Sequence, residues 1–383
     1  MHSPRLRRSL AYAGAIVASL VLSGALSACS SSTQSLTPAG TIPNPATNQS
    51  AAHVATMELW HRSLARNPLP GSGCFQTSYP SVQWKRVACS TPPHLLYPLP
   101  ASRQEIEALA QSVGNGADYT ANASPNLMST AIGAFPQVTG VTRVKSVENP
   151  LFGCCGENGV NSYTLQLNSY FFTTTACGNI QNCAGWEQFV YENPPGSSRG
   201  QLFIQDWLIP TGRSGLSGCP PGKGWEFADG GCVQNSPNAV NVPNVSIKSL
   251  GSFIETGTAA SSGDSIFLSV GSTEYGMKNI QGDGITDLSA HWEGAEFNVI
   301  GNAGGDIAKF NKGSTIAVSL QTDTGLTTAP LCPANSGTTG ESNNLKFVTA
   351  PANPPELANP SIEFKMSNAS GSGKGSCDQV QGI

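Results

Sequence analysis

From about residue 146 onward, apolar and polar residues alternate in short segments that are separated by Gly, Asn, Pro and Ser. The segments are rich in β-branched and aromatic residues, and no long helical period interrupts the series. No repeat at a fixed period is visible, which argues against a propeller or a solenoid. The pattern predicts an all-β domain over residues 146–383, built as an antiparallel β-sandwich or jelly roll. The predicted strands are 162–172, 186–192, 202–209, 240–250, 265–271, 295–300, 315–320, 344–349 and 361–366.

Residues 55–145 read as a Pro-rich, disulfide-bearing extension with one short helix. Ser102 and Glu105 match a capping box, and the apolar period that follows ends at Gly114. We expect the apolar stripe of this helix to pack on the β domain. The residues of the stripe are Ile106, Leu109, Ala110 and Val113.

The first 28 residues have the order of an export signal. Three arginines precede an uncharged apolar run over 10–26, and small residues follow it. The run is too short to span a membrane. The string Leu26-Ser27-Ala28-Cys29 resembles the bacterial lipoprotein box, which implies cleavage after residue 28 and a lipid on Cys29. The alternative is an ordinary secretory signal with a chance cysteine.

The polar composition after Cys29 predicts a flexible linker over residues 29–54, rich in Ser, Thr, Pro and Asn. Together with the signal, this linker predicts a protein whose folded part is exported and faces the extracytoplasmic space. The lipid on Cys29 would hold it on the bacterial cell membrane or the outer membrane.

Charge narrows the classes of partner. Removal of residues 1–28 takes away three of the 20 basic side chains and none of the 24 acidic ones, which leaves a net charge of about −7. This acidic balance without a basic cluster argues against nucleic acid as a partner. No Walker-type glycine loop and no H-E-x-x-H motif is present, so we expect neither a cofactor nor a metal. We also expect the protein to be a monomer.

The cysteines predict disulfides. Eleven cysteines less Cys29 leave an even number, as is usual in exported chains. Zinc is disfavoured, because no C-x-x-C pair exists and histidines are scarce. Adjacent Cys154 and Cys155 form either a vicinal bridge or bonds to two separate partners. Short loops favour the pairs Cys74–Cys89, Cys177–Cys183 and Cys219–Cys232, with Cys332–Cys377 as a longer closure.

Two predicted strands carry polar residues that share a face. Alternation places Glu296 and Asn298 on one side of their strand, and Gln188 on one side of its strand with Trp186 and Glu192. On a concave sheet, the carboxylate would take a proton from water and the amide would donate to a developing oxyanion. The alternative is a set of polar residues on the solvated face of a sandwich.

The stretch Ala295-Glu296-Phe297-Asn298-Val299, followed by the predicted strand 315–320, resembles the glutamic peptidase (eqolisin) family. Those proteins are acid endopeptidases on a concanavalin-like β-sandwich. The resemblance covers roughly residues 160–325. It implies that Glu296 is the catalytic glutamate and that Gln188 is the catalytic glutamine.

The same resemblance assigns two further acidic positions. Glu192 matches an acidic residue four places after the glutamine, and Asp206-Trp207 matches an acidic-aromatic pair on the next strand; both acids would tune Glu296. The chain departs from the family at Tyr163-Thr164, where a tryptophan is expected. A second departure is Leu165-Gln166-Leu167-Asn168, in place of a Val-Gly-Ile-Asp pattern.

Two other classes of function stay open. One is a non-catalytic module that binds glycans or peptides, with Trp186, Trp207 and Trp292 stacking on sugar rings. The other is a purely structural envelope protein. The extension would be either a propeptide that covers the cleft or a permanent cap held by Cys74–Cys89. Convergence of the Glu296 carboxylate and the Gln188 amide in an open cleft would favour the enzyme.

Overall fold

The structure is a computed structural model. Several predicted features lie outside the residues it describes: the signal peptide, lipidated Cys29 and its linker, the helix from Ser102, and the Cys154-Cys155 pair. Among the described residues, no helix is long and apolar enough to cross a membrane. The described residues are 56–99 (except 58, 62, 65 and 66), 113–150, 156–212, 214–279, 283–349, 359–369 and 375–383.

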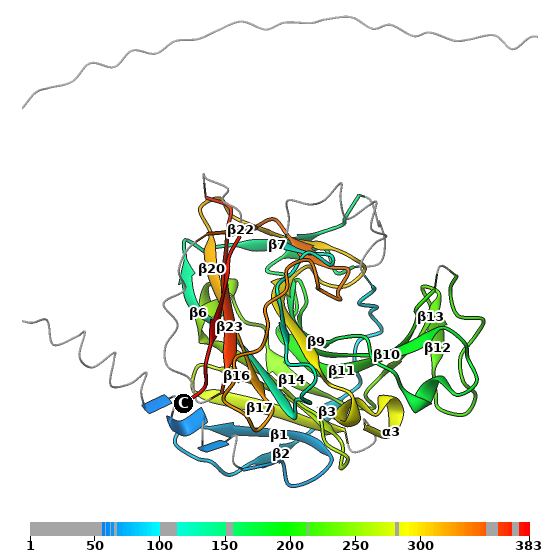
Figure 1. Ribbon diagram of the computed structural model, residues 1–383. Coiled ribbons are helices and arrows are strands. Elements are labelled where there is room, and N and C mark those ends of the chain that lie inside the picture. The colour runs from blue at the N-terminus through cyan, green and yellow to red at the C-terminus, as the bar shows by residue number, and fades with distance from the viewer. Residues whose placement is uncertain are drawn as a thin grey trace, which may run out of the picture. The chain divides into compact units, whose positions relative to one another are not determined.

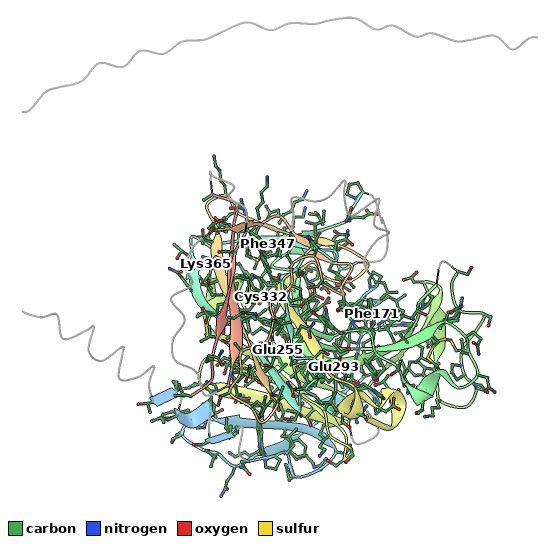
Figure 2. All side chains as sticks on the ribbon, in the orientation of Figure 1. Phe171, Glu255, Glu293, Cys332, Phe347 and Lys365 are labelled. Carbon is green, nitrogen blue, oxygen red and sulfur yellow. A yellow bond between two sulfur atoms is a disulfide. The ribbon has the colours of Figure 1, made fainter. Side chains whose placement is uncertain are left out.

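The fold is all-β, as the alternating pattern predicts, and side chains fill the space between its sheets (Figure 1, Figure 2). Sheet A, which runs from the left side of the body to its bottom in Figure 1, is a ten-stranded antiparallel sheet. In spatial order its strands are β2 (Lys85–Val87), β1 (Gly73–Ser78), β17 (Thr273–Asn279), β16 (Asp264–Val270), β15 (Phe253–Thr258), β6 (Thr130–Thr139), β20 (Thr315–Asp323), β23 (Ser361–Ser367) and β22 (Lys346–Val348), and β24 (Cys377–Val380) pairs with β23.

Sheet B is a nine-stranded sheet and carries every residue predicted to be catalytic. Its far end, β12 and β13, extends to the right of the body in Figure 1. Its main strands in order are β12 (Glu226–Ala228), β13 (Gly231–Asn235), β11 (Arg199–Pro210), β10 (Cys183–Asn193), β9 (Tyr163–Ser169), β18 (Gly294–Ile300) and β5 (Thr120–Asn122), while β14 (Ala239–Pro243) pairs with β11 and with β3 (Cys89–Ser90).

A small third sheet contains the single parallel pairing of the described residues, between β19 and β21. Its strands are β4 (Val113–Gly114), β21 (Ser342–Asn343), β19 (Ile307–Phe310), β7 (Val144–Val147) and β8 (Gly159–Val160). The connections include the short helices η1 (Thr175–Cys177), η2 (Ile247–Ser252), α3 (Asp283–Thr286) and η3 (Leu288–Ala290).

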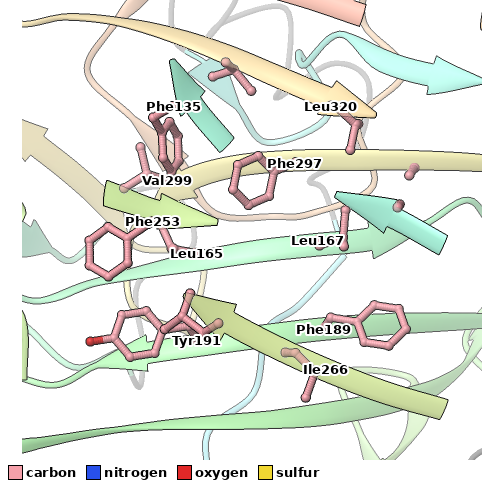
Figure 3. Packing of buried hydrophobic residues seen from close by; sticks show 14 of the residues in the cluster. Phe135, Leu165, Leu167, Phe189, Tyr191, Phe253, Ile266, Phe297, Val299 and Leu320 are labelled. Carbon is pink, nitrogen blue, oxygen red and sulfur yellow. The ribbon is translucent and has the colours of Figure 1, made fainter. Parts of the chain in front are cut away.

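The core lies between sheets A and B (Figure 3). Phe297 of β18 meets Phe135 of β6 across the sandwich, with ring centroids 5.1 Å apart. Sheet A makes room for this ring with Gly133, since a Cβ there would lie 2.3 Å from the Phe297 ring. Gly257 of β15 likewise leaves room for the ring of Phe189 of β10, since a Cβ there would lie 2.7 Å from that ring. Two glycines in sheet A thus accept two phenylalanines of sheet B, which fixes how the sheets face each other.

Each of the nine predicted segments contains a strand, although segment 240–250 ends as a strand at Pro243 and continues into η2. The predicted boundary at 145/146 needs correction, because Ala51–Ile383 forms one compact unit. Strand β6, from the predicted extension, lies at the centre of sheet A between β15 and β20. Gly133 and Pro136 obscure this strand in the sequence. The ladder with β20 shifts register beside Pro136, which is where a strand tolerates proline.

All four predicted disulfide pairings are present: Cys74–Cys89, Cys177–Cys183, Cys219–Cys232 and Cys332–Cys377. Disulfides of this number persist in oxidising compartments and are rare in the cytosol. The body of the protein therefore belongs to an oxidising, extracytoplasmic environment.

Candidate functional site

Strand register places the two predicted catalytic residues in one row across sheet B. Glu296 of β18 pairs with Asn168 of β9, and Asn168 pairs with Gln188 of β10. Gln188 pairs in turn with Gln205 of β11, and directly opposite residues point to the same face. Their neighbour Phe297 points into the core. The row therefore lies on the outer face of sheet B, away from sheet A.

This outer face is covered. Glu296 retains 1% of its exposure, and Asn168, Gln188 and Gln205 retain none. Two segments lie over the row: residues 91–99, called here the strap, and residues 333–341, called the cover loop. Polar side chains stay buried at tolerable cost only when they are hydrogen-bonded, so the contacts of this layer decide what it can do.

One oxygen of Glu296 holds the cover loop. Glu296 Oε2 accepts the backbone N–H of Thr338 at 2.6 Å, the Thr338 hydroxyl at 2.9 Å and the backbone N–H of Thr339 at 3.1 Å. The other oxygen, Oε1, has no hydrogen-bond partner among the residues that the structure describes. The cover loop therefore fixes the carboxyl in position through one of its two oxygens.

Asp118 forms a carboxyl pair with Glu296. Asp118 Oδ1 accepts the Asn298 side-chain amide at 2.8 Å and the Gly114 N–H at 3.2 Å, whereas Oδ2 has no donor in the described part of the chain. A Cβ added to Gly337 would lie 2.7 Å from Glu296 Oε1 and 3.1 Å from Asp118 Cβ, so both carboxyls flank this glycine. Burial, followed by the charge of Glu296 and a hydrogen bond with it, raises the pKa of Asp118 well above its usual range. Asp118 is therefore the carboxyl that keeps its proton, and it can donate a hydrogen bond to Glu296.

The Gln188 amide belongs to a second network on the same face. Its Nε2 donates to Gln166 Oε1 at 3.3 Å, and the Thr339 hydroxyl donates to the same oxygen at 2.8 Å. Gln166 Nε2 donates to Glu341 Oε2 at 3.4 Å. Burial raises the pKa of Glu341 to about 7. Gln188 Oε1 and Asn168 Oδ1 have no donor within the described ranges. These two amide oxygens are unused acceptors, whereas Glu296 Oε1 lies on the side of its carboxyl that is near Asp118.

Glu192 lies on the face of Glu296 but four residues along β10 from Gln188. Four residues of strand span about 13 Å, so Glu192 belongs to another part of the face. Its Oε1 accepts the Asn302 side-chain amide at 3.2 Å, and burial raises its pKa to about 7. Glu192 therefore has no direct contact through which to tune Glu296.

Asp206 requires a correction, because it points to the opposite face of sheet B. Its register partner is Glu187, and the Thr286 hydroxyl donates to both carboxyls, at 2.8 Å to Glu187 and 3.3 Å to Asp206. Strand alternation explains the placement, since Gln205 is the residue of β11 that lies in register with Gln188. Asp206 is thus separated from Glu296 by the sheet itself.

The three predicted stacking tryptophans are all buried. Trp186 and Trp207 do lie on the outer face, where Trp186 Nε1 donates to the Thr338 hydroxyl at 3.1 Å and Trp207 Nε1 donates to Gln205 Oε1 at 2.9 Å. Trp292 is a core residue and stacks on Phe189, with ring centroids 5.6 Å apart. The placement of Trp292 corrects its assignment to a binding face.

Sequence reasoning missed most partners of Glu296. Asn168 and Gln166 carried a signal, because they alternate with leucines in strand β9 and so share a face. Asp118, Thr338 and Thr339 lie in irregular chain or at the ends of short strands, where no period marks them. Their roles depend on contacts between residues far apart in the sequence.

Comparisons with protein-family models, with curated proteins and with solved structures find no match for this chain. The resemblance to the glutamic peptidases therefore depends on the short motifs around Glu296 and Gln188. Within the described ranges, no three His, Cys, Asp or Glu residues are placed to hold a metal ion. The geometry around Glu296 carries the functional interpretation.

Proposed function

We propose that this protein is an exported acid endopeptidase of the glutamic type, anchored to a bacterial membrane by a lipid on Cys29. The observation that carries the proposal is the row of Glu296, Asn168 and Gln188 on one face of sheet B, in which the two amides keep an unused oxygen acceptor beside the Glu296 carboxyl. Water between these side chains would find acceptors for both of its protons.

The proposed reaction uses Glu296 as the general base. The carboxylate takes a proton from water while the water oxygen bonds to the carbonyl carbon of the substrate. An N–H of Gln188 stabilises the oxyanion, since the hydrogen bond to Gln166 occupies only one of its two amide hydrogens. The carbon–nitrogen bond then breaks, and Glu296 returns its proton to the leaving nitrogen.

The buried carboxyls support activity at acid pH. Burial raises the pKa of Asp118, Glu192 and Glu341, and neither lysine nor arginine contributes at any of the three. The proton of Asp118 persists at acid pH and is lost as the pH rises. These buried carboxyls are neutral in an acidic medium, so the face that they occupy is suited to acid pH.

Substrate access requires the strap and the cover loop to move, because both cover the row. A specific observation favours a second candidate, a module that binds peptides without cleaving them: Glu296 Oε2 accepts three hydrogen bonds from the cover loop, which is the contact pattern of a structural anchor. Both candidates place the ligand on the outer face of sheet B.

Hydrolysis of a denatured protein substrate from pH 2 to 7 distinguishes the two candidates. The purified protein should cleave at acid pH, and Glu296→Gln should not. Glu363→Gln is the matched control, since Glu363 is equally buried but lies on β23 of sheet A; this variant should cleave like the wild type. Equal cleavage by all three proteins, or none by any of them while folded, would reject the peptidase and leave the binding module.

A further inference from the structure

The strap, residues 91–99, lies on the outer face of sheet B and is bound there by side-chain amides. Gln201 Nε2 donates to the Thr91 carbonyl at 2.9 Å, and Asn235 Nδ2 donates to the Pro93 carbonyl at 3.1 Å. Gln205 Nε2 donates to the Leu95 carbonyl at 2.9 Å. The amides thus bind every second carbonyl of the strap, which is the periodicity of an extended chain.

Gln205 makes the most specific of these contacts. While its Nε2 binds the Leu95 carbonyl, its Oε1 accepts the backbone N–H of Tyr97 at 3.2 Å. One amide side chain therefore pairs with two peptide groups on either side of Leu96, as the backbone of a neighbouring strand would. Gln205 lies in the same row as Gln188 and Glu296, so this contact connects the strap with the proposed site.

The Tyr97 side chain is fully buried on this face. It packs with Val190 and Phe203, the register pair beside Gln188 and Gln205, and its ring centroid is 6.1 Å from that of Phe203. Its hydroxyl lies 3.4 Å from Asn302 Oδ1. An aromatic ring with a polar tip thus fills a pocket that is apolar along its walls and polar at its end.

The end of the strap reaches the cover loop. The Gly340 N–H donates to the Pro98 carbonyl at 2.8 Å, one residue beyond Thr339, which binds Glu296. Among the described strap residues, Tyr97 is the one whose N–H is bound by a side chain of the sheet. The other contacts use carbonyls, which proline retains although it lacks an N–H.

We propose that this face is a peptide-binding groove for extended, proline-containing chains with a tyrosine at the Tyr97 position, and that the strap is its displaceable occupant. The inference names the ligand class of the proposed function and uses the same face. Its test measures binding rather than cleavage, so the two proposals can fail separately. A folded protein that binds the peptide but cleaves no substrate from pH 2 to 7 would reject the peptidase and leave the groove.

The test uses a fluorescent peptide with the strap sequence, TPPHLLYPL. A tethered segment competes at an effective concentration in the millimolar range, so wild-type protein should bind the peptide weakly. Tyr97→Ala empties the pocket and should bind it at least tenfold more tightly, as measured by fluorescence anisotropy at pH 6. The same peptide with alanine for tyrosine should bind at least tenfold less tightly to this variant.

Gln205→Glu, introduced into the Tyr97→Ala protein, tests whether the Gln205 amide binds the peptide backbone. The carboxylate still accepts from Trp207 and from a peptide N–H but donates to no carbonyl, so peptide affinity should fall at least tenfold. If folded Tyr97→Ala protein binds neither peptide, or binds both equally, the strap is a permanent cap and the groove is rejected.

A photocrosslinking peptide, with benzophenone in place of the tyrosine ring, tests the wild-type protein directly and does not depend on the folding of a variant. Crosslinks that mass spectrometry maps to β10 and β11 support the groove. An absence of crosslinks at millimolar peptide, the concentration range that competes with the tethered strap, contradicts it, as do crosslinks scattered over the surface.

Discussion

Glu296 and Gln188 lie in the same row on the outer face of sheet B, with Asn168 of the intervening strand between them. Two strand spacings separate their Cα atoms by about 10 Å, a gap that two long side chains and one water molecule can bridge. The same row continues through Gln205 to the strap. Proposed chemistry and proposed peptide binding therefore use neighbouring positions of one register.

Replacement of Glu296 should separate its chemical role from its structural role. In Glu296→Gln, the amide oxygen can accept the Thr338 and Thr339 hydrogen bonds while the amide nitrogen donates to Asp118, so stability should change by less than about 1 kcal/mol. Glu296→Ala leaves those donors buried without an acceptor and should cost about 3 kcal/mol. Urea unfolding at pH 5 measures both values. A glutamine variant as unstable as the alanine variant would contradict the pairing of Glu296 with Asp118.

The protein should be most stable in acid. Burial raises the folded-state pKa of Glu192, Glu341 and Glu363 to about 7 and that of Asp306 to about 6, whereas unfolded carboxyls titrate near pH 4. The native state therefore holds more protons than the unfolded state between about pH 4 and 7, and its stability should fall as the pH rises through this window. Thermal unfolding at pH 4, 5, 6 and 7 measures the trend. A melting temperature that is constant or rises toward pH 7 would contradict it.

Asp118→Asn should flatten this pH dependence. The asparagine oxygen can accept from Asn298 and Gly114, and its nitrogen can donate to Glu296, so the fold should be retained. One group with a raised pKa is then removed, and the pH slope of stability should decrease by up to one proton. Urea midpoints at several pH values give this slope. Asp323→Asn is a suitable control, since Asp323 lies at the end of β20 outside this cluster; an equal effect in both variants would exclude a special role for Asp118.

Gly133 should resist substitution because Phe297 occupies the space beside it. A Cβ at this position would lie 2.3 Å from the phenylalanine ring, so Gly133→Ala must push the sheets apart and should cost about 1–3 kcal/mol. Gly71→Ala is the control, since nothing lies within 4 Å of its Cβ. Phe297→Leu should recover part of the loss in the double variant. Additive losses in the double variant would show that the contact does not limit packing.

The sequence by itself indicated nine of the segments that contain strands and which of their side chains share a face, and it favoured the four cysteine pairings that the structure contains. These properties are local: alternation fixes the face of a strand residue, and loop length favours near cysteines. The same alternation placed Glu296, Gln188 and Glu192 on faces that register then brought together on sheet B.

Only the tertiary structure decided what covers that face and which residues contact Glu296. Asp118, Thr338 and Tyr97 come from distant parts of the chain and carry no periodic signal. Register also decided that Asp206 lies behind the sheet, because adjacent residues of a strand point to opposite sides. Trp292 precedes strand β18 and lies in the core, where it stacks on Phe189. Alternation specifies a face, but the occupant of that face depends on long-range packing, which no local pattern encodes.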